Sequence, residues 1–213
     1  MEKPQIAVIG AGLMGHGIAY LFAAGGHEVR VQDPVAAARE TLQQRLREIC
    51  DLLGTDRAAA DRVTAGESIE WAAKDAGIVI EAALEQLPLK RAIFAELERA
   101  APADAILASN TSALPITRIS EGLKTRHRMV GSHFWNPPHL VPLVEIVLTG
   151  PENRPSADRL AGALRSAGRH PVLVHRDIPG FIGNRLQRHA RRCTSGFVTF
   201  AICLAQIKRS PIA

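Results

Sequence analysis

Apolar residues at the start of the chain form short continuous runs separated by a stretch that favours a helix. Residues 6–9 read IAVI, residues 13–24 favour a helix closed by a Gly-Gly pair, and residues 29–31 form a second short run. A continuous apolar strand is typical of a parallel sheet covered by helices on both faces. The pattern therefore predicts the opening of a βαβ unit, with Asp33 just after its second strand.

The same alternation of strands and helices continues to about residue 175. Residues 54–69 give no strong signal, and no repeat or low-complexity linker divides the chain. We expect one Rossmann-type, doubly wound, mostly parallel α/β domain over residues 1–187. The further elements that the pattern predicts are helices at 36–53, 90–100 and 157–167, and strands at 78–80, 105–108, 129–133, 143–148 and 172–174.

A glycine-rich segment between the first strand and the first helix matches G-x-G-x-x-G. Gly10 allows a tight turn, Gly12 lets the backbone approach a pyrophosphate, and Gly15 lets the helix pack closely on the strand. Asp33 is placed to accept a hydrogen bond from a ribose 2′-hydroxyl and would repel a 2′-phosphate, which favours NAD, although Arg30 lies nearby. We expect the cofactor site to include Gly10, Gly12, Leu13, Met14, Gly15 and Asp33.

Polar residues also follow or interrupt later strands, where a closed core would not need them. Residues 109–112 read SNTS directly after the strand at 105–108, His133 ends another strand, and Glu145 interrupts the run LVEIV. A carboxylate inside such a strand is costly unless it is paired, and a histidine is the obvious partner. The pair would fix the imidazole tautomer and raise its basicity, as a general base requires. A capped surface histidine and an edge-strand glutamate form the structural alternative.

Five motifs in this order resemble the NAD-binding domain of the L-3-hydroxyacyl-CoA dehydrogenase family, over about residues 4–187. The motifs are IAVIGAGLMGHGIA, EAALEQLPLKRAIF, SNTSALPIT, GSHFWNPPHLVPLVEIV and DIPGFIGNRL. The resemblance implies that His133 takes the proton from the substrate's 3-hydroxyl and that Glu145 holds and polarises His133. It also implies that Ser112 and Asn184 bond the hydroxyl and the developing carbonyl.

The resemblance further implies cofactor contacts on the nicotinamide side. Glu85 and Lys90 match such contacts in the family, and Asn110 would line the same cleft. Two of the implied residues have structural alternatives, since Lys90 would also suit a solvated helix surface and Asn184 would also suit the cap of a turn.

The implied reaction is the NAD-dependent oxidation of a 3-hydroxyacyl-CoA to its 3-keto product. In the family a long, Lys-rich helical hairpin after the second strand contributes to CoA binding. Here residues 36–66 are shorter and contain no lysine, and their arginines are interleaved with carboxylates as on a solvated helix surface. The run NPPHLVPLVE also resembles branches that oxidise small hydroxy acids such as carnitine or gulonate. Both substrate classes stay open, as does a catalytically impaired remnant that binds NAD without turnover.

The net charge of +5 suggests an acidic partner until its position along the chain is considered. Residues 185–213 carry +6 and no carboxylate, which leaves −1 for residues 1–184. A basic nucleic-acid arm would need aromatic stacking groups beside the charges, so we predict a small-molecule substrate and neither nucleic acid nor membrane as partner. We expect the atypical tail, residues 188–213, to replace the family's C-terminal all-helical domain through a frameshift or premature end, which puts the family's homodimer in doubt here.

Targeting and redox signals predict a cytoplasmic protein. The first residues do not resemble a signal peptide, and no run approaches the roughly 18 apolar residues of a membrane span. The three cysteines form an odd set without metal-ligand spacing, so we expect a reducing compartment and no metal site.

Overall fold

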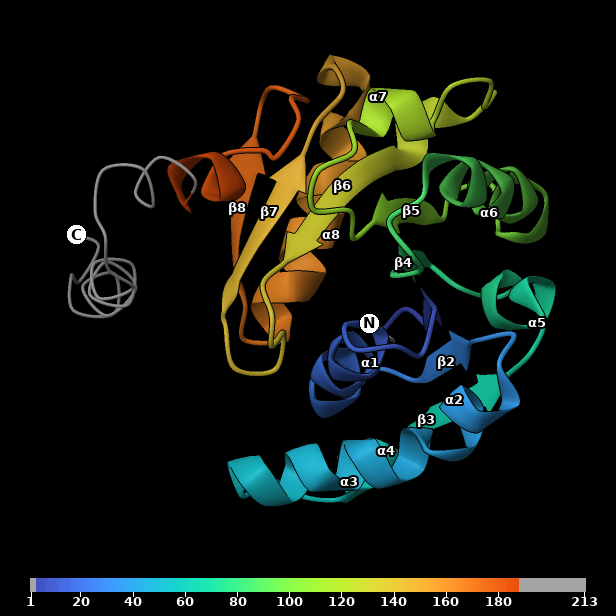
Figure 1. Cartoon of the computed structure of the whole chain (residues 1–213), viewed down its shortest axis with the longest axis vertical. Coiled ribbons are helices and arrows are strands. Elements are labelled where there is room, and N and C mark those ends of the chain that lie inside the picture. The colour runs from blue at the N-terminus through green and yellow to red at the C-terminus, as the bar shows by residue number, and fades with distance from the viewer. Residues whose placement is uncertain (1–2, 188–213) are drawn as a thin grey trace.

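The computed structural model describes residues 3–187. Within this range the strands form one sheet in the order β3-β2-β1-β4-β5-β6-β7-β8 (Figure 1). Neighbouring strands are parallel except β6 and β7, which are antiparallel. The prediction of a doubly wound, mostly parallel α/β domain is therefore confirmed. The elements are β1 (Ile6–Ile9), α1 (Gly15–Ala24), β2 (Val29–Gln32), α2 (Ala36–Glu40), α3 (Leu42–Leu53), α4 (Ala58–Asp61), β3 (Val63–Gly66), α5 (Ile69–Ala73), β4 (Ile78–Glu81), α6 (Leu87–Ala100), β5 (Ile106–Ser109), α7 (Ile116–Ile119), η1 (Arg126–Arg128), β6 (Met129–Phe134), β7 (Leu143–Val147), η2 (Pro151–Asn153), α8 (Arg154–Ser166) and β8 (His170–Val174).

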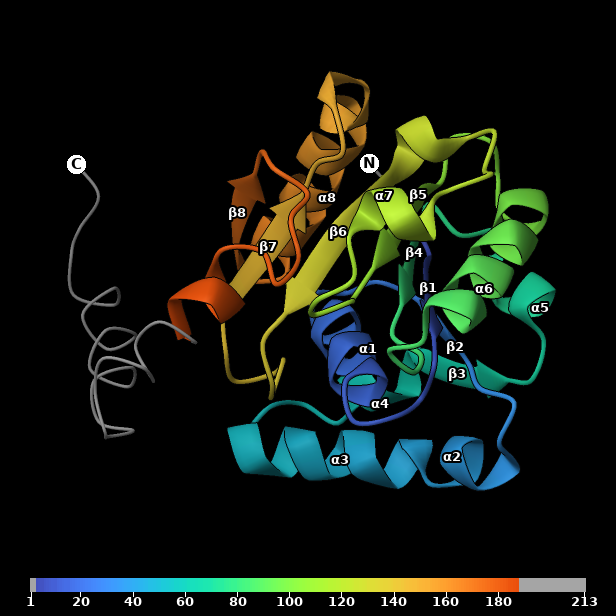
Figure 2. The ribbon, with the colours of Figure 1, turned by 45° about the horizontal axis from the view of Figure 1, so that its top comes forward.

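Helices cover both faces of the sheet, because successive strand residues point to opposite sides. In β1, Ile6 and Val8 pack in the same core as buried residues of α1, α3, α4 and α8. Ala7 and Ile9 pack in a second core with α5, α6 and α7. Figure 2 shows α1, α3 and α4 close together in its lower part, in agreement with their mutual contacts. This double cover explains why the first strand is continuously apolar.

The sheet reverses its winding direction between β1 and β4. From β1 the strand order runs to β2 and β3 on one side, and to β4, β5 and β6 on the other. At such a switch point the connections leave the carboxyl ends of the strands in opposite directions and open a crevice, which is where ligands bind in this class of fold. The glycine-rich segment follows β1 at this point.

Some predicted boundaries were wrong. The helix expected at 36–53 is divided at Thr41, whose hydroxyl donates to the carbonyl of Ala37 and competes with helix continuation. Residues 54–69, which gave no strong signal, contain α4 and the edge strand β3. In β3 only Val63 is buried. Ser109 does not follow its strand but ends it, and β6 extends one residue past His133. The basic tail, with Cys193 and Cys203, lies outside the described residues.

Candidate active site

The glycine-rich loop leaves room on one side only. Gly10 has φ +104°, and a Cβ there would lie 2.9 Å from the carbonyl oxygen of Ala82. A Cβ at Gly15 would lie 1.7 Å from the carbonyl oxygen of Gly10, so only glycine permits this approach of helix to strand. At Gly12 a Cβ would meet no atom within 4 Å, because the outer side of the loop is open. The open side beside the first turn of α1 fits an approaching pyrophosphate. Leu13 is exposed and Met14 precedes α1 within this loop.

Asp33 lies next to this loop and helps to hold it. Its Oδ2 accepts from the backbone N–H of Ala11 at 2.8 Å, and its Oδ1 accepts from that of Val35 at 2.9 Å. Arg45 of α3 donates through Nη1 to the carbonyl of Ala11 at 2.7 Å. The expectation that the arginines of residues 36–66 form only a solvated surface was therefore wrong for Arg45, which is half-buried and braces the loop.

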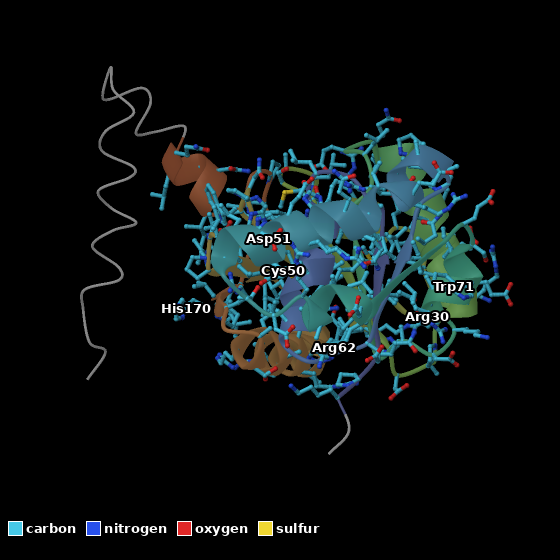
Figure 3. All side chains as sticks on the ribbon, turned by 90° about the horizontal axis from the view of Figure 1, so that it is seen from below. Arg30, Cys50, Asp51, Arg62, Trp71 and His170 are labelled. Atoms are coloured by element: carbon cyan, nitrogen blue, oxygen red, sulfur yellow. The ribbon has the colours of Figure 1, made fainter. Side chains whose placement is uncertain are left out.

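Arg30, which lies near Asp33 in the sequence, is engaged by neighbouring side chains. Its guanidinium pairs with Asp75 at 3.0 Å and lies 5.6 Å from the ring centroid of Trp71, beside which Figure 3 shows it. It also donates to the Trp71 carbonyl. These contacts commit the Arg30 guanidinium to Trp71 and Asp75, on the α5 side of the sheet.

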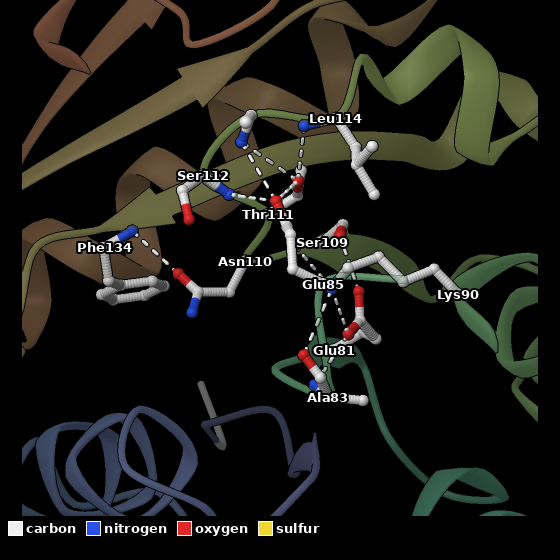
Figure 4. Close-up of polar contacts among 11 residues, drawn as sticks. Glu81, Ala83, Glu85, Lys90, Ser109, Asn110, Thr111, Ser112, Leu114 and Phe134 are labelled. Atoms are coloured by element: carbon white, nitrogen blue, oxygen red, sulfur yellow. Dashed lines mark hydrogen bonds and ion pairs between the residues drawn. The ribbon is translucent and has the colours of Figure 1, made fainter. Parts of the chain in front are cut away.

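A buried ionic network occupies the carboxyl ends of β4 and β5 (Figure 4). Lys90 of α6 has no exposed side-chain surface, and its Nζ donates to Oε1 of Glu81 at 2.7 Å. Glu81 also accepts from the hydroxyl of Ser109 at 2.6 Å and from the N–H of Ala83 at 2.7 Å. A buried ion pair of this kind is tolerated because further hydrogen bonds satisfy the carboxylate. The alternative interpretation of Lys90 as a solvated helix residue was wrong.

Glu85 connects this network to the SNTS segment. Its Oε1 accepts from the Thr111 hydroxyl at 2.5 Å, from the N–H of Ser112 at 2.9 Å and from the N–H of Ala113 at 3.1 Å, and its Oε2 lies 3.4 Å from the Lys90 ammonium. Partial burial opposes ionisation, but the Thr111 hydroxyl, Lys90 and the backbone donors outweigh it and hold the pKa of Glu85 below its ordinary value. Glu85 therefore stays ionised and fixes the loop that carries Ser112.

Asn110 connects the SNTS segment to the next strand. Its Oδ1 accepts from the N–H of Phe134 at 3.0 Å, which ties the end of β5 to the end of β6 (Figure 4). Its Nδ2 is left for other partners.

His133 and Glu145 lie opposite each other in the antiparallel register of β6 and β7. His133 Nδ1 is 2.7 Å from Glu145 Oε2, and the two side chains are 7% and 4% exposed. Burial raises the pKa of Glu145, but the hydrogen bonds from His133 and from the N–H groups of Gly183 and Ile182 outweigh it and hold this pKa below its ordinary value. Because an ionised carboxylate only accepts, the Nδ1 atom carries the imidazole proton.

Asn184 directly follows Gly183, whose N–H donates to Glu145 of the histidine pair. Its Nδ2 donates to the carbonyl of Ser112 at 2.8 Å, which joins the segment after β8 to the SNTS loop. The structure thus brings together the residues predicted on the nicotinamide and substrate sides: Glu85, Lys90, Asn110, Ser112, His133, Glu145 and Asn184. The proposed roles of these residues stay predictions.

Several residues of this site were not predicted from the sequence. Glu81 closes the otherwise apolar strand IVIE, and a carboxylate at that position was a signal of the same kind as Glu145. Thr111, which donates to Glu85, lies inside the SNTS segment without a signal of its own. Phe181, which is fully buried with φ +45°, left no signal, because a left-handed phenylalanine cannot be recognised from residue type.

Over the described part of the chain, no His, Cys, Asp and Glu cluster has the arrangement of a metal site. In the same residues, no helix combines the length and apolar character needed to cross a membrane.

The fold and the site define a doubly wound domain of the dinucleotide-binding class that also contains a buried His–Glu pair. The sequence profile "3-hydroxyacyl-CoA dehydrogenase, NAD binding domain" matches residues 5–178. The chain therefore belongs to the 3-hydroxyacyl-CoA dehydrogenase family, and its cofactor is NAD.

Three relatives illustrate the range of the family. L-carnitine dehydrogenase of Streptomyces griseus is 38% identical over 86% of this chain and 56% of the relative. The fatty acid oxidation complex subunit alpha of Ectopseudomonas oleovorans is 35% identical over 87% of this chain and 27% of the relative. The crystal structure of 3-hydroxybutyryl-CoA dehydrogenase from Escherichia coli superimposes with a TM-score of 0.80 at 34% identity, over 88% of this chain and 41% of that one. The chain thus spans only part of each of these proteins.

Proposed function

We propose that this chain provides the NAD-binding and catalytic groups for oxidation of the secondary hydroxyl of a 3-hydroxyacyl-CoA, or of a related short hydroxy acid such as carnitine or gulonate, to the 3-keto product. The observation that carries the proposal is the buried contact of 2.7 Å between His133 Nδ1 and Glu145 Oε2. A neutral histidine oriented by a carboxylate is the base that such an oxidation requires.

The proton of the substrate hydroxyl goes to Nε2 of His133. Nδ1 keeps the ring proton and donates a hydrogen bond through it to Glu145, so Nε2 has the free lone pair. When Nε2 accepts the second proton, the ring becomes an imidazolium, and the ionised Glu145 stabilises the new charge. NAD, when bound, supplies the acceptor for the hydride that leaves the carbinol carbon. The C–O bond becomes a carbonyl, so the proton and the hydride account for the two hydrogens lost.

Two polar groups are proposed to bond the reacting oxygen. Ser112 is exposed at the loop, and Asn184 is held against it by the bond from its Nδ2 to the Ser112 carbonyl. A hydroxyl and an amide held in place in this way can donate to an oxygen on which negative charge develops. The bond from the Ser112 N–H to Glu85, and the bond from the N–H of Gly183, next to Asn184, to Glu145, support the proposal because they fix the backbone that carries the two donors.

The cofactor is proposed to lie along the carboxyl ends of β1, β2 and β4. The loop from Gly10 to Gly15 would hold the pyrophosphate and Asp33 the adenosine ribose. On the nicotinamide side, Glu85 and Asn110 would face the cofactor, and the buried Lys90 would act by holding Glu85. We also propose a cytoplasmic location, a small-molecule substrate rather than nucleic acid, and the homodimer of the full-length family wherever the rest of its fold is present.

Activity can be tested by mixing the protein with NAD and 3-hydroxybutyryl-CoA, carnitine or gulonate, and following NADH absorbance. Turnover of one substrate and not the others assigns the substrate class. His133→Ala should lower kcat by about 10²–10⁴-fold with little change in NAD affinity, whereas His175→Ala, at an exposed histidine outside the site, should leave both unchanged. An active His133→Ala variant would refute the assignment of the base. NAD binding without turnover of any substrate would instead favour the catalytically impaired alternative.

A further inference from the structure

The segment that follows β8 crosses the face of the sheet that carries His133 and Glu145. Asp177 begins this crossing, and its carboxylate accepts from the N–H of Ile116 at 2.9 Å and from that of Thr117 at 2.7 Å, at the start of α7. Asn184 ends the crossing at the Ser112 carbonyl. Residues 177–184 are therefore fixed at both ends to the loops around the site.

Between these anchors, two backbone N–H groups converge on one oxygen of Glu145. Oε1 accepts from Ile182 N at 3.0 Å and from Gly183 N at 2.9 Å, while Oε2 faces His133. Strand register alone places the Cα atoms of His133 and Glu145 opposite each other, but a glutamate side chain retains several rotatable bonds. The two N–H donors fix the plane of the carboxylate, and charge-assisted bonds of this kind are strong.

Phe181 gives the segment the turn that aims these donors. Gly180 has φ +77° and Phe181 has φ +45°, a conformation that costs energy for any residue with a side chain. The Phe181 side chain is fully buried, and its ring centroid is 5.8 Å from that of His133. Strain of this kind persists only where the surroundings enforce it, and it occurs characteristically at functional sites.

Gly183 is required by the space around the same carboxylate. A Cβ at this position would lie 2.2 Å from Cζ2 of Trp135 and 3.1 Å from Oε2 of Glu145. Neither the indole ring nor the paired carboxylate can move away without disturbing the histidine, because the Trp135 ring also contacts His133 at a centroid distance of 5.3 Å. The absence of a side chain is what lets the Gly183 N–H approach Glu145.

We propose that Phe181 and Gly183 are positioning residues of the reaction: the turn at 180–183 locks the Glu145 carboxylate by two N–H donors and supports the His133 ring, so that the segment after β8 sets the geometry of the base. The lowered pKa of Glu145 agrees with this arrangement, since the two N–H groups favour its ionised form. The catalytic consequence rests on the proposed function, but the geometry itself can be tested without turnover.

The direct test is Gly183→Ala, with Gly162→Ala as the matched control, because a Cβ at Gly162 in α8 meets no atom within 4 Å. In wild-type protein the Nδ1 proton of His133 should give a far-downfield proton NMR resonance, assigned by its loss in His133→Ala. Gly183→Ala should remove or shift that resonance and should leave NADH affinity within about twofold. It should lower kcat roughly 10²-fold, which is the cost of misplacing a catalytic group by about 1 Å, without raising the KM for NAD. Gly162→Ala should change none of these.

A second measurement decides the matter if Gly183→Ala fails to fold. Glu145→Gln keeps the shape of the side chain and removes its charge, so the amide proton resonances of Ile182 and Gly183 should both move upfield. Unmoved amide resonances in Glu145→Gln, or an unmoved imidazole resonance with full kcat in a folded Gly183→Ala, would overturn the proposal. If the resonance shifts as expected while wild-type protein turns over no substrate, the positioning role stands and the proposed function fails.

Discussion

The buried pair of Lys90 and Glu81 gives the sharpest test of how the site is held together. Both side chains have no exposed surface, and Nζ lies 2.7 Å from Oε1. Lys90→Met keeps most of the side-chain volume and removes the charge, which leaves Glu81 with the Ser109 hydroxyl and the Ala83 N–H as its remaining donors. Removing one partner of a buried pair costs about 3–5 kcal/mol, because the remaining charge is uncompensated. For a domain of this size that corresponds to a fall in Tm of about 10 °C.

Urea unfolding followed by circular dichroism measures the free energy of unfolding for this comparison. The matched control is Arg154→Met, because the pair of Arg154 and Asp158 at 2.8 Å is about half exposed, and such surface pairs contribute less than about 1 kcal/mol. Adding Glu81→Gln to Lys90→Met should restore part of the lost stability, since it removes the unpaired charge. A loss below about 1 kcal/mol for Lys90→Met, or a double variant that is less stable by the sum of two independent losses, would refute the reasoning.

Three further predictions concern the cofactor loop and the carboxylates. Asp33→Ala should weaken NADH binding by about 10–100-fold, the value of a hydrogen bond to a charged group, and should weaken NADPH binding less; equal losses in fluorescence titrations would contradict the role of Asp33. Gly15→Ala should abolish NADH binding, since its Cβ would lie 1.7 Å from the Gly10 carbonyl oxygen, whereas a variant that binds normally would show that the loop can shift. Glu85 and Glu145 have pKa values below the ordinary one, so the stability they contribute to the fold is fully present above about pH 4.3 and is lost as the pH falls through their pKa values in the folded protein. Acid unfolding of Glu85→Gln should therefore show a shallower pH dependence than that of wild type.

The sheet and its cofactor loop were predictable because both rest on local patterns. Short apolar runs identified every strand except β3, and the G-x-G-x-x-G spacing identified the turn after β1. Strand β3 was not predicted, because it is a four-residue edge strand in which only the first residue is buried, so it has almost no apolar pattern. The helix break at Thr41 was not predicted for a similar reason: the apolar spacing continues through this residue, and only the hydrogen bond from the Thr41 side chain marks the break.

A contact within the site was predictable from the sequence only where a charged residue in an apolar strand required a partner. A glutamate inside an apolar strand needs a donor, and His133, at the end of a strand 12 residues earlier, was the obvious partner. The same reasoning applied to Glu81 would have identified a buried partner on the following helix, and Lys90 stands nine residues further along.

The donors to the second oxygen of Glu145 were beyond such reasoning. They are backbone groups 37 and 38 residues away, and their direction depends on a left-handed turn at Phe181 that no residue type signals. A backbone donor is present at almost every position, so sequence identity carries no trace of which one is used. What the sequence does retain is the exclusion of a side chain at Gly183, where a Cβ would meet Trp135. In this site, therefore, the residues that perform the proposed chemistry can be read from their polarity, whereas the residues that position them are recognised only by the space and the backbone conformation they require.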